Sequence, residues 1–154
     1  MKIEYEYSIS LPSMIVWKYI KDAAILKKSL TGCMKFEETT NGIYQASADI
    51  NFGPIQDVFA MEIRRVKEKS PSYYHLILKG KGKLGGIDGE ADLFIKEIQG
   101  TSKLKLQAEA DLNGSLAIVG NKLLEGSAKK GLKDFFQCVE KEIKRDIYLQ
   151  KRGR

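Results

Sequence analysis

The C-terminal third of the chain constrains the fold most strongly, because it joins one amphipathic strand to one long amphipathic helix. From Lys103 to Leu112, apolar residues alternate with charged or amide side chains, which is the two-residue period of a strand with one buried face. Asn113-Gly114 ends this segment. From Ser115 onward, apolar residues recur at spacings of three and four, as on one face of a helix: Leu116, Val119, Leu123, Leu124, Leu132, Phe135, Phe136, Val139 and Ile143. Such a helix of about thirty residues is about 50 Å long, enough to cross a whole sheet.

Small residues interrupt the apolar face of this helix. Gly120, Ser127 and Gly131 fall within roughly 40° of one another on a helical wheel. Each glycine inside a helix costs about 1 kcal/mol relative to alanine. Two interpretations remain open: close packing of small residues on small residues, or a cavity between helix and sheet. We favour the cavity, because a curved sheet rarely lets a straight helix touch every strand.

The apolar stripe also changes direction along this helix. Leu116, Val119 and Leu123 define the buried side of its first half, whereas the stripe of the second half is rotated by roughly a third of a turn. This mismatch predicts a bend or a change of winding near Gly126 to Gly131. The second half should then pack firmly, and the first half should form a looser lid.

The remaining elements complete an α+β fold. Residues 2–10 alternate as a strand, Pro12-Ser13 opens a short helix, and Lys21-Asp22 opens a second one. Further strands are expected at about 33–40, 43–52, 55–67, 73–81 and 87–98, followed by 103–112. Short turns between consecutive strands predict one curved antiparallel sheet of about seven strands, which wraps around the long C-terminal helix. The pattern predicts a single domain over residues 1–154.

Composition and charge narrow the class of protein. The chain has 154 residues, 43% of them hydrophobic and 30% charged, which is typical of a soluble globular protein. No apolar run is long enough to span a membrane, and we expect a cytoplasmic protein. The net charge is +6, and the densest basic stretch runs from Glu140 to Arg154. We interpret that stretch as a solvated helix end, with contact to an anionic membrane or an acidic partner as the alternative. No motif points to nucleic acid.

Chemical motifs are weak throughout. Gly80 to Gly85 fits G-x-G-x-x-G, but a strand follows it where a dinucleotide-binding fold needs a helix. Cys33, Cys138 and His75 form neither a disulfide framework nor a metal-ligand set, and His75 should point away from the cavity. We expect no cofactor, no metal and no catalytic group. Tyr44, Asp57 and Ser127 are the polar candidates inside the cavity.

Inward-facing positions of the strands and the helix define the candidate ligand-binding residues. They are apolar and often small: Tyr44, Ala46, Ala48, Ile50, Phe59, Met61, Leu76, Leu78, Ala91, Leu93, Leu106, Ala108, Leu116, Gly120, Leu123 and Ser127.

Several short motifs, in this order, resemble one family. They are Pro12 with Val16-Trp17, Leu30-Thr31-Gly32-Cys33, Gly53-Pro54-Ile55, Gly80-Lys81-Gly82, Gly89-Glu90-Ala91-Asp92, Gly114-Ser115-Leu116-Ala117 and Phe135-Phe136. The chain resembles the carbon monoxide dehydrogenase CoxG family from about Ile3 to Ile143, within the START-like (SRPBCC) superfamily that includes the birch pollen allergen. The resemblance implies a helix-grip fold with a hydrophobic cavity. It also implies association with a molybdenum hydroxylase of the carbon monoxide dehydrogenase type, as a carrier of a membrane-derived lipid or quinone.

Three hypotheses about function follow. The first is a non-enzymatic protein that binds a hydrophobic or amphipathic small molecule between sheet and helix. The second is an assembly or membrane-recruitment factor that works through its surface, peripheral at the inner face of the membrane. The third is a cyclase or hydrolase, since START-like relatives include such enzymes.

Overall fold

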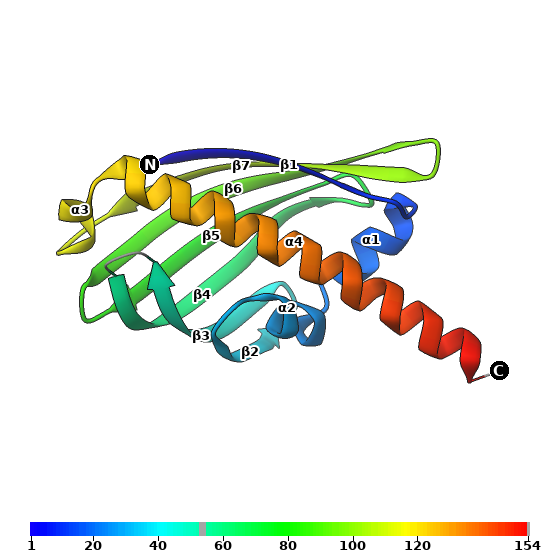
Figure 1. Cartoon of the computed structure of the whole chain (residues 1–154), viewed down its shortest axis with the longest axis horizontal. Coiled ribbons are helices and arrows are strands. Elements are labelled where there is room, and N and C mark those ends of the chain that lie inside the picture. Colours follow the sequence, from blue (N-terminus) through cyan, green and yellow to red (C-terminus); the bar gives the residue numbers. More distant parts are fainter. Residues whose placement is uncertain (53–54, 154) are drawn as a thin grey trace.

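One sheet and one long helix dominate the structure, a computed structural model that describes residues 1–52 and 55–153. Seven antiparallel strands form the sheet in the order β1-β7-β6-β5-β4-β3-β2, and α4 lies across its concave face (Figure 1). The elements are β1 (Lys2–Ile9), α1 (Ser13–Ile20), α2 (Ala23–Ser29), β2 (Cys33–Thr40), β3 (Ile43–Phe52), β4 (Ile55–Lys69), β5 (Tyr73–Gly82), β6 (Gly85–Ile98), β7 (Thr101–Leu112), α3 (Leu116–Val119) and α4 (Asn121–Arg152). This architecture confirms the predicted α+β helix-grip fold.

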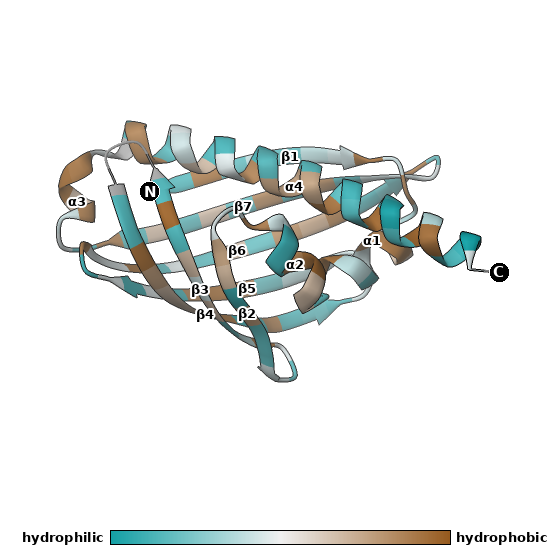
Figure 2. Ribbon diagram, turned by 60° about the horizontal axis from the view of Figure 1, so that its bottom comes forward, coloured by the Kyte–Doolittle hydropathy of each residue, from teal (hydrophilic) through white to brown (hydrophobic). Residues whose placement is uncertain are grey.

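The two short helices connect the two edges of the sheet. β1 and β2 are consecutive strands in the chain but lie at opposite edges, with α1 and α2 between them. Pro12 precedes α1, where its missing N–H removes no helical hydrogen bond. The Asp22 carboxylate caps α2 by accepting from the backbone N–H of Ala24 at 2.9 Å and of Ile25 at 3.2 Å. Figure 2 shows that strands at the β2 edge run at a steep angle to those at the β1 edge, so the sheet is strongly twisted.

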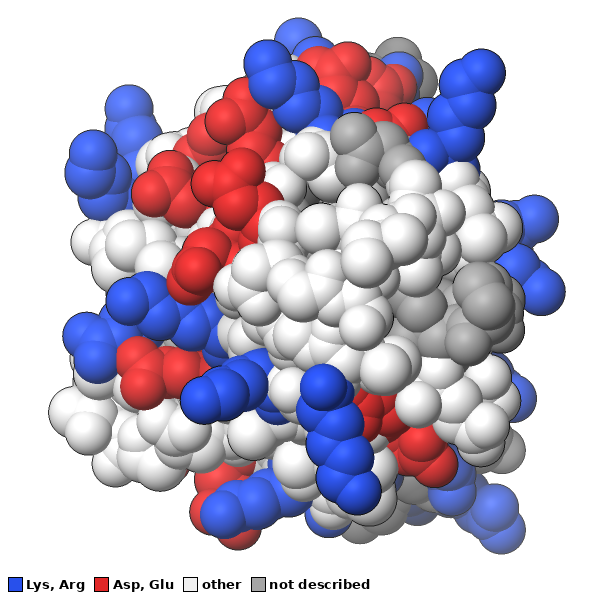
Figure 3. All heavy atoms as spheres, turned by 90° about the vertical axis from the view of Figure 1, so that its left-hand side faces the viewer, with Lys and Arg blue, Asp and Glu red and all other residues white. Residues whose placement is uncertain are grey.

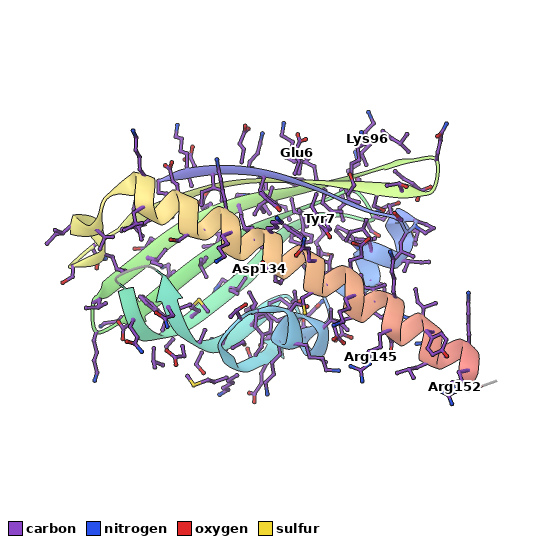
Figure 4. All side chains as sticks on the ribbon, viewed as in Figure 1. Glu6, Tyr7, Lys96, Asp134, Arg145 and Arg152 are labelled. Carbon is purple, nitrogen blue, oxygen red and sulfur yellow. The ribbon has the colours of Figure 1, made fainter. Side chains whose placement is uncertain are left out.

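The strand register places the predicted apolar positions on one face. Directly opposite residues form rows across the sheet, and one such row is Ala46, Met61, Gly80, Ile87 and Leu112. Figure 4 shows the same alternation in β1, where Tyr7 points towards α4 and Glu6 points away from it. The glycine-rich segment is a hairpin, because β5 continues to Gly82 and β6 begins at Gly85. The turn is thus shorter than the gap between the expected strands at 73–81 and 87–98.

The C-terminal helix differs from the prediction in one respect. A single helix from Ser115 onward was expected, but α3 ends at Val119 and α4 begins at Asn121. Between them Gly120 has a φ of 101°, a conformation that side chains with a Cβ rarely adopt. From there α4 is one uninterrupted α-helix, so the expected change of winding near residues 126–131 is not found in this described segment.

The break at Gly120 also changes which leucine is buried. Leu123 was predicted on the buried face and is 46% exposed, whereas Leu124 is 8% exposed. The prediction continued the helical phase of Leu116 through a residue that is not helical. The buried residues of α4 continue with Phe136, Val139 and Ile143, and the 12 residues from Leu124 to Phe136 still turn the buried stripe by about 120° around the helix.

Two packed regions clamp α4 onto the sheet at opposite ends. At one end, Trp17 and Phe136 pack with Tyr74, Leu93 and neighbouring residues, and Val139 and Ile143 pack against α1 and α2. At the other end, Leu116 and Leu124 pack on Phe59. The second half of α4 is therefore firmly packed, as predicted. Among the described residues, no helix is long and apolar enough to cross a lipid bilayer.

Candidate functional site

The centre of the inner sheet face lies between the two packed ends. Leu76, Leu78, Ala91, Leu106 and Ala108 point towards α4 from the middle of the sheet, and each remains only half-buried. Strands flank every one of these residues on both sides. Their side chains face α4 without being fully covered by it, and Leu78 also borders a hollow on the outer face.

Over this region α4 presents small side chains to the central strands of the sheet. Its side chains there are small, since Ser127, Ala128 and Gly131 separate Leu124 from Leu132. The α4 backbone lies near β1 and β3 at more positions than it lies near the strands between them. Helix and sheet thus pack firmly at the two ends, and between them α4 runs beside β1 and β3 above a half-buried apolar surface.

Two aromatic residues of β1 form the wall of this region on one side. Tyr5 and Tyr7 both stack on Phe136, with ring centroids 5.9 and 5.6 Å away. The Tyr7 hydroxyl donates to the Glu140 carboxylate at 2.9 Å. Burial, then this hydrogen bond, raises the pKa of Tyr7 to about 12. Sequence reasoning omitted both tyrosines from the candidate site, although they share phase with the inward residues Ile3 and Ile9.

A charged cluster closes the opposite rim, beneath α1 and α2. The Tyr44 hydroxyl donates to the Lys21 carbonyl at 2.8 Å and accepts from the Arg65 guanidinium. Arg65, whose side chain is 7% exposed, also pairs with Glu68 and lies 3.8 Å from Glu38. Burial raises the pKa of Tyr44 despite the nearby guanidinium. Through Tyr44, these bonds join β3 and the neighbouring β4 to the segment between α1 and α2.

The buried carboxylate of Asp57 has a local partner as well. Its oxygens accept hydrogen bonds from the backbone N–H of the neighbouring Val58 at 2.8 Å and from that of Leu84, which lies in the β5–β6 turn, at 2.9 Å. A Cβ on Gly82 would lie 2.5 Å from this carboxylate, so the contact requires glycine there. Of the three polar candidates, Ser127 is the one on the stretch of α4 above the inner face, where it is half-buried.

The structure distributes the predicted ligand-binding residues over three environments. The half-buried centre includes Leu76, Leu78, Ala91, Leu106 and Ala108, with Met61 and Ile50 half-buried towards the α3 end. The packed regions hold Tyr44, Ala46, Ala48, Phe59, Leu93 and Leu116. Gly120 and Leu123 lie on the solvent side of the α3–α4 junction.

The outer face carries groups with a different chemistry. His75 lies there as predicted, 2.7 Å from the Asp92 carboxylate and 3.5 Å from Glu90. A hollow of about 490 Å³ on this face has Lys79, Asp88 and Asp111 among its lining residues. Charged residues line it together with Ile77 and Leu78, so it is more polar than the inner surface. Cys33 and Cys138 are free thiols, and burial raises the pKa of Cys33. Within the described residues, no cluster of histidine, cysteine and acidic side chains is arranged to hold a metal.

Comparison with known proteins agrees with this architecture. The family model for the carbon monoxide dehydrogenase protein CoxG matches residues 6–144. Curated protein sequences yield no match. A conserved protein from Geobacillus kaustophilus has a similar structure, with 25% identity, a TM-score of 0.90, and coverage of 94% of this chain and 96% of that one.

More distant structures share the fold. The ZhuI aromatase/cyclase from Streptomyces sp. R1128 aligns with a TM-score of 0.71 at 11% identity, covering 96% of this chain and 95% of that one. A START superfamily protein from Mycobacterium smegmatis aligns with a TM-score of 0.70 at 8% identity, covering 94% and 97%. With a family model that spans most of its length and a sheet that grips one long helix, this chain belongs to the carbon monoxide dehydrogenase CoxG family.

Proposed function

We propose that this protein binds a hydrophobic or amphipathic small molecule, such as a lipid or a quinone, between the inner sheet face and α4. One observation carries the proposal: apolar residues at the centre of a seven-stranded sheet stay only half-buried although their side chains face α4. Exposed apolar surface in such a place has a free-energy cost that a bound apolar molecule would remove. Ligand sites of this kind are concave and mostly apolar, with few polar groups.

The proposal is tested by filling the space. Ala91 and Ala108 lie directly opposite each other on β6 and β7. Phenylalanine at either position should weaken binding of the apolar probe N-phenyl-1-naphthylamine by about tenfold or more, because the ring occupies the volume that the probe needs. Ala60→Phe is the matched control, since Ala60 is exposed on the outer face and should leave binding unchanged.

The same positions test the close-packed alternative. If α4 packed tightly on the sheet, Ala91→Val and Ala108→Val would already destabilise the protein, and the wild type would not bind the probe. Folded phenylalanine variants that bind the probe as the wild type does would place the binding site elsewhere. Native mass spectrometry of the purified protein would identify a molecule that copurifies with it.

The family supports a more specific role. We infer from it that the bound molecule passes to or from a molybdenum hydroxylase of the carbon monoxide dehydrogenase type. The test is to add quinone-loaded protein to such a dehydrogenase and to follow quinone reduction that depends on carbon monoxide. A rate equal to that with free quinone would contradict a carrier role.

A surface-acting role is the second candidate. The end of α4 carries Lys151 and Arg152 beside the exposed Tyr148 and Leu149, and Figure 4 shows Arg145 and Arg152 pointing away from the sheet. If the protein acts only as a membrane-recruitment factor, alanine at Lys151 and Arg152 will abolish its binding to anionic membranes while binding of the apolar probe stays intact. A cyclase-like role has less support, because the polar candidates Tyr44 and Asp57 are already engaged in bonds that hold the fold.

A further inference from the structure

The end of the molecule that carries α3 exposes apolar side chains. Ile118 is 84% exposed, more than the other exposed large hydrophobic residues among those described, and Leu123 is 46% exposed. Ala117 is also exposed, and Val119 is half-buried. We name these four residues the α3 tip. Figure 3 views this end, where uncharged side chains fill the centre of the face.

The fold fixes the α3 tip in this exposed position. Leu116 is 3% exposed and packs with Phe59 and Leu124, which anchors α3 by one residue. The Leu116 N–H donates to the Leu84 carbonyl at 3.2 Å, which ties α3 to the β5–β6 turn. With Leu116 turned inward, Ile118 two residues later lies roughly 200° around the helix and faces outward. The exposure of Ile118 is therefore built into the anchoring of α3.

Lysines stand beside the α3 tip. Lys122 is exposed in the first turn of α4, and Lys83 is exposed in the turn that contacts α3. Lys129 and Lys130 follow on the exposed part of α4, about 10–12 Å from Lys122 along the helix. That spacing exceeds the Debye length of about 8 Å at physiological salt, so Lys129 and Lys130 reinforce the attraction of Lys122 to an anionic surface mainly at lower salt. Figure 3 shows basic side chains on every side of the uncharged centre, with acidic ones mainly along the upper left and top and others at the bottom and lower right.

We infer that the α3 tip docks on an anionic lipid bilayer, with Ile118 and Leu123 entering the interface and Lys83 and Lys122 contacting headgroups. A short amphipathic element that combines apolar side chains with lysine suits the boundary between headgroups and acyl chains. A protein partner fits less well, because a single helical turn falls short of the roughly 800 Å² that each partner buries in a stable interface.

This inference rests on the proposed function in one respect, the purpose of the contact. The α3 tip covers the packed end formed by Leu116, Leu124 and Phe59, beside the half-buried centre of the inner face. Docking there brings that end of the proposed binding space to the bilayer, where apolar ligands are dissolved. The contact itself is measurable whether or not the space holds a ligand.

The test is sedimentation with phosphatidylcholine vesicles that contain or lack phosphatidylserine. The wild type should bind the anionic vesicles, and Ile118→Asp should bind about tenfold or more weakly, because an apolar side chain is lost from the interface. Ile98→Asp is the matched control: Ile98 is 42% exposed in the hairpin at the other end of the molecule (Figure 1), and its replacement should not change binding. Alanine at Lys83 and Lys122 should weaken binding to anionic vesicles by about fivefold per lysine.

A second readout locates the contact directly. In a Trp17→Phe background, the Ile118→Trp variant should shift its emission to shorter wavelength when anionic vesicles are added. Equal binding of the Ile118→Asp and Ile98→Asp variants, or an unshifted emission, would overturn the inference. A dimer in vesicle-free solution that Ile118→Asp disrupts would also overturn it, since the α3 tip would then be a protein interface. Probe binding by the Ile118→Asp variant in free solution should stay normal, so failure of the ligand proposal is read separately.

Discussion

Two glycines near the start of α4 should respond oppositely to alanine. A Cβ added at Gly120 or at Gly126 would meet no atom within 4 Å, so neither substitution causes a clash. Gly126 lies in the exposed interior of α4, and alanine there should raise the free energy of unfolding by about 1 kcal/mol through helix propensity alone. Gly120 has a φ of 101° and a ψ of 135°, and alanine in such a region costs about 1–3 kcal/mol. The two variants should therefore differ by about 2–4 kcal/mol.

Urea denaturation of both variants measures this difference directly. In thermal unfolding, Gly126→Ala should raise Tm by about 2–4 °C. Gly120→Ala should lower Tm by a similar or larger amount. Equal stabilisation by both substitutions would show that Gly120 is helical in solution. The break between α3 and α4, and the outward position of Ile118 that follows from it, would then be wrong.

Two further predictions concern titrating groups. The Tyr73 hydroxyl lies 2.5 Å from the Asp92 carboxylate, and this hydrogen bond, followed by the one from His75, holds the pKa of Asp92 below its usual range. The ionised Asp92 carboxylate therefore contributes stability above pH about 4, and this contribution is lost as the carboxylate is protonated at lower pH. Tyr73→Phe should move the Asp92 pKa back up in a carboxyl NMR titration, and an unchanged value would contradict this. Because the pKa of Tyr7 is raised from 10.0 to about 12, its contribution to stability is present below pH about 10 and lost between pH about 10 and 12. Glu140→Gln should lower that pKa in an ultraviolet titration, and burial should keep it above 10.

The alternation of apolar and polar residues predicted most of the sheet, because a two-residue period fixes which face of a strand is buried. Ala46 and Met61 were placed on the inner face from their phase alone, and the register pairs them directly. The start of α2 at Asp22 was also predicted from the sequence, and the Asp22 side chain caps that helix. These features depend on neighbours in the chain, and a single sequence contains that information.

The α3–α4 junction was missed because it depends on the backbone of one residue. Gly120 was interpreted as a small residue in a helix wall, and glycine is equally compatible with the positive φ that ends a helix. That choice placed Leu123 on the wrong face. For the candidate site, sequence phase identified the inward residues but could not separate the packed Leu93 from the half-buried Ala91. Whether α1 and α4 cover an inward residue depends on contacts between distant parts of the chain. Leu93 is buried because Trp17 of α1 and Phe136 of α4 pack on it.

The position of β1 at the edge of the sheet has a consequence for how the chain folds during synthesis. β1 is made first, yet its pairing partner β7 lies roughly 100 residues later, so at about 5–20 residues per second β1 waits about 5–20 s for that partner. The hairpins from β2 to β7 can form meanwhile through local contacts, whereas Tyr5 and Tyr7 cannot stack on Phe136 until α4 has also emerged. The first strand is thus the last to be incorporated into the sheet, and the nascent chain exposes the apolar face of β1 for most of its translation.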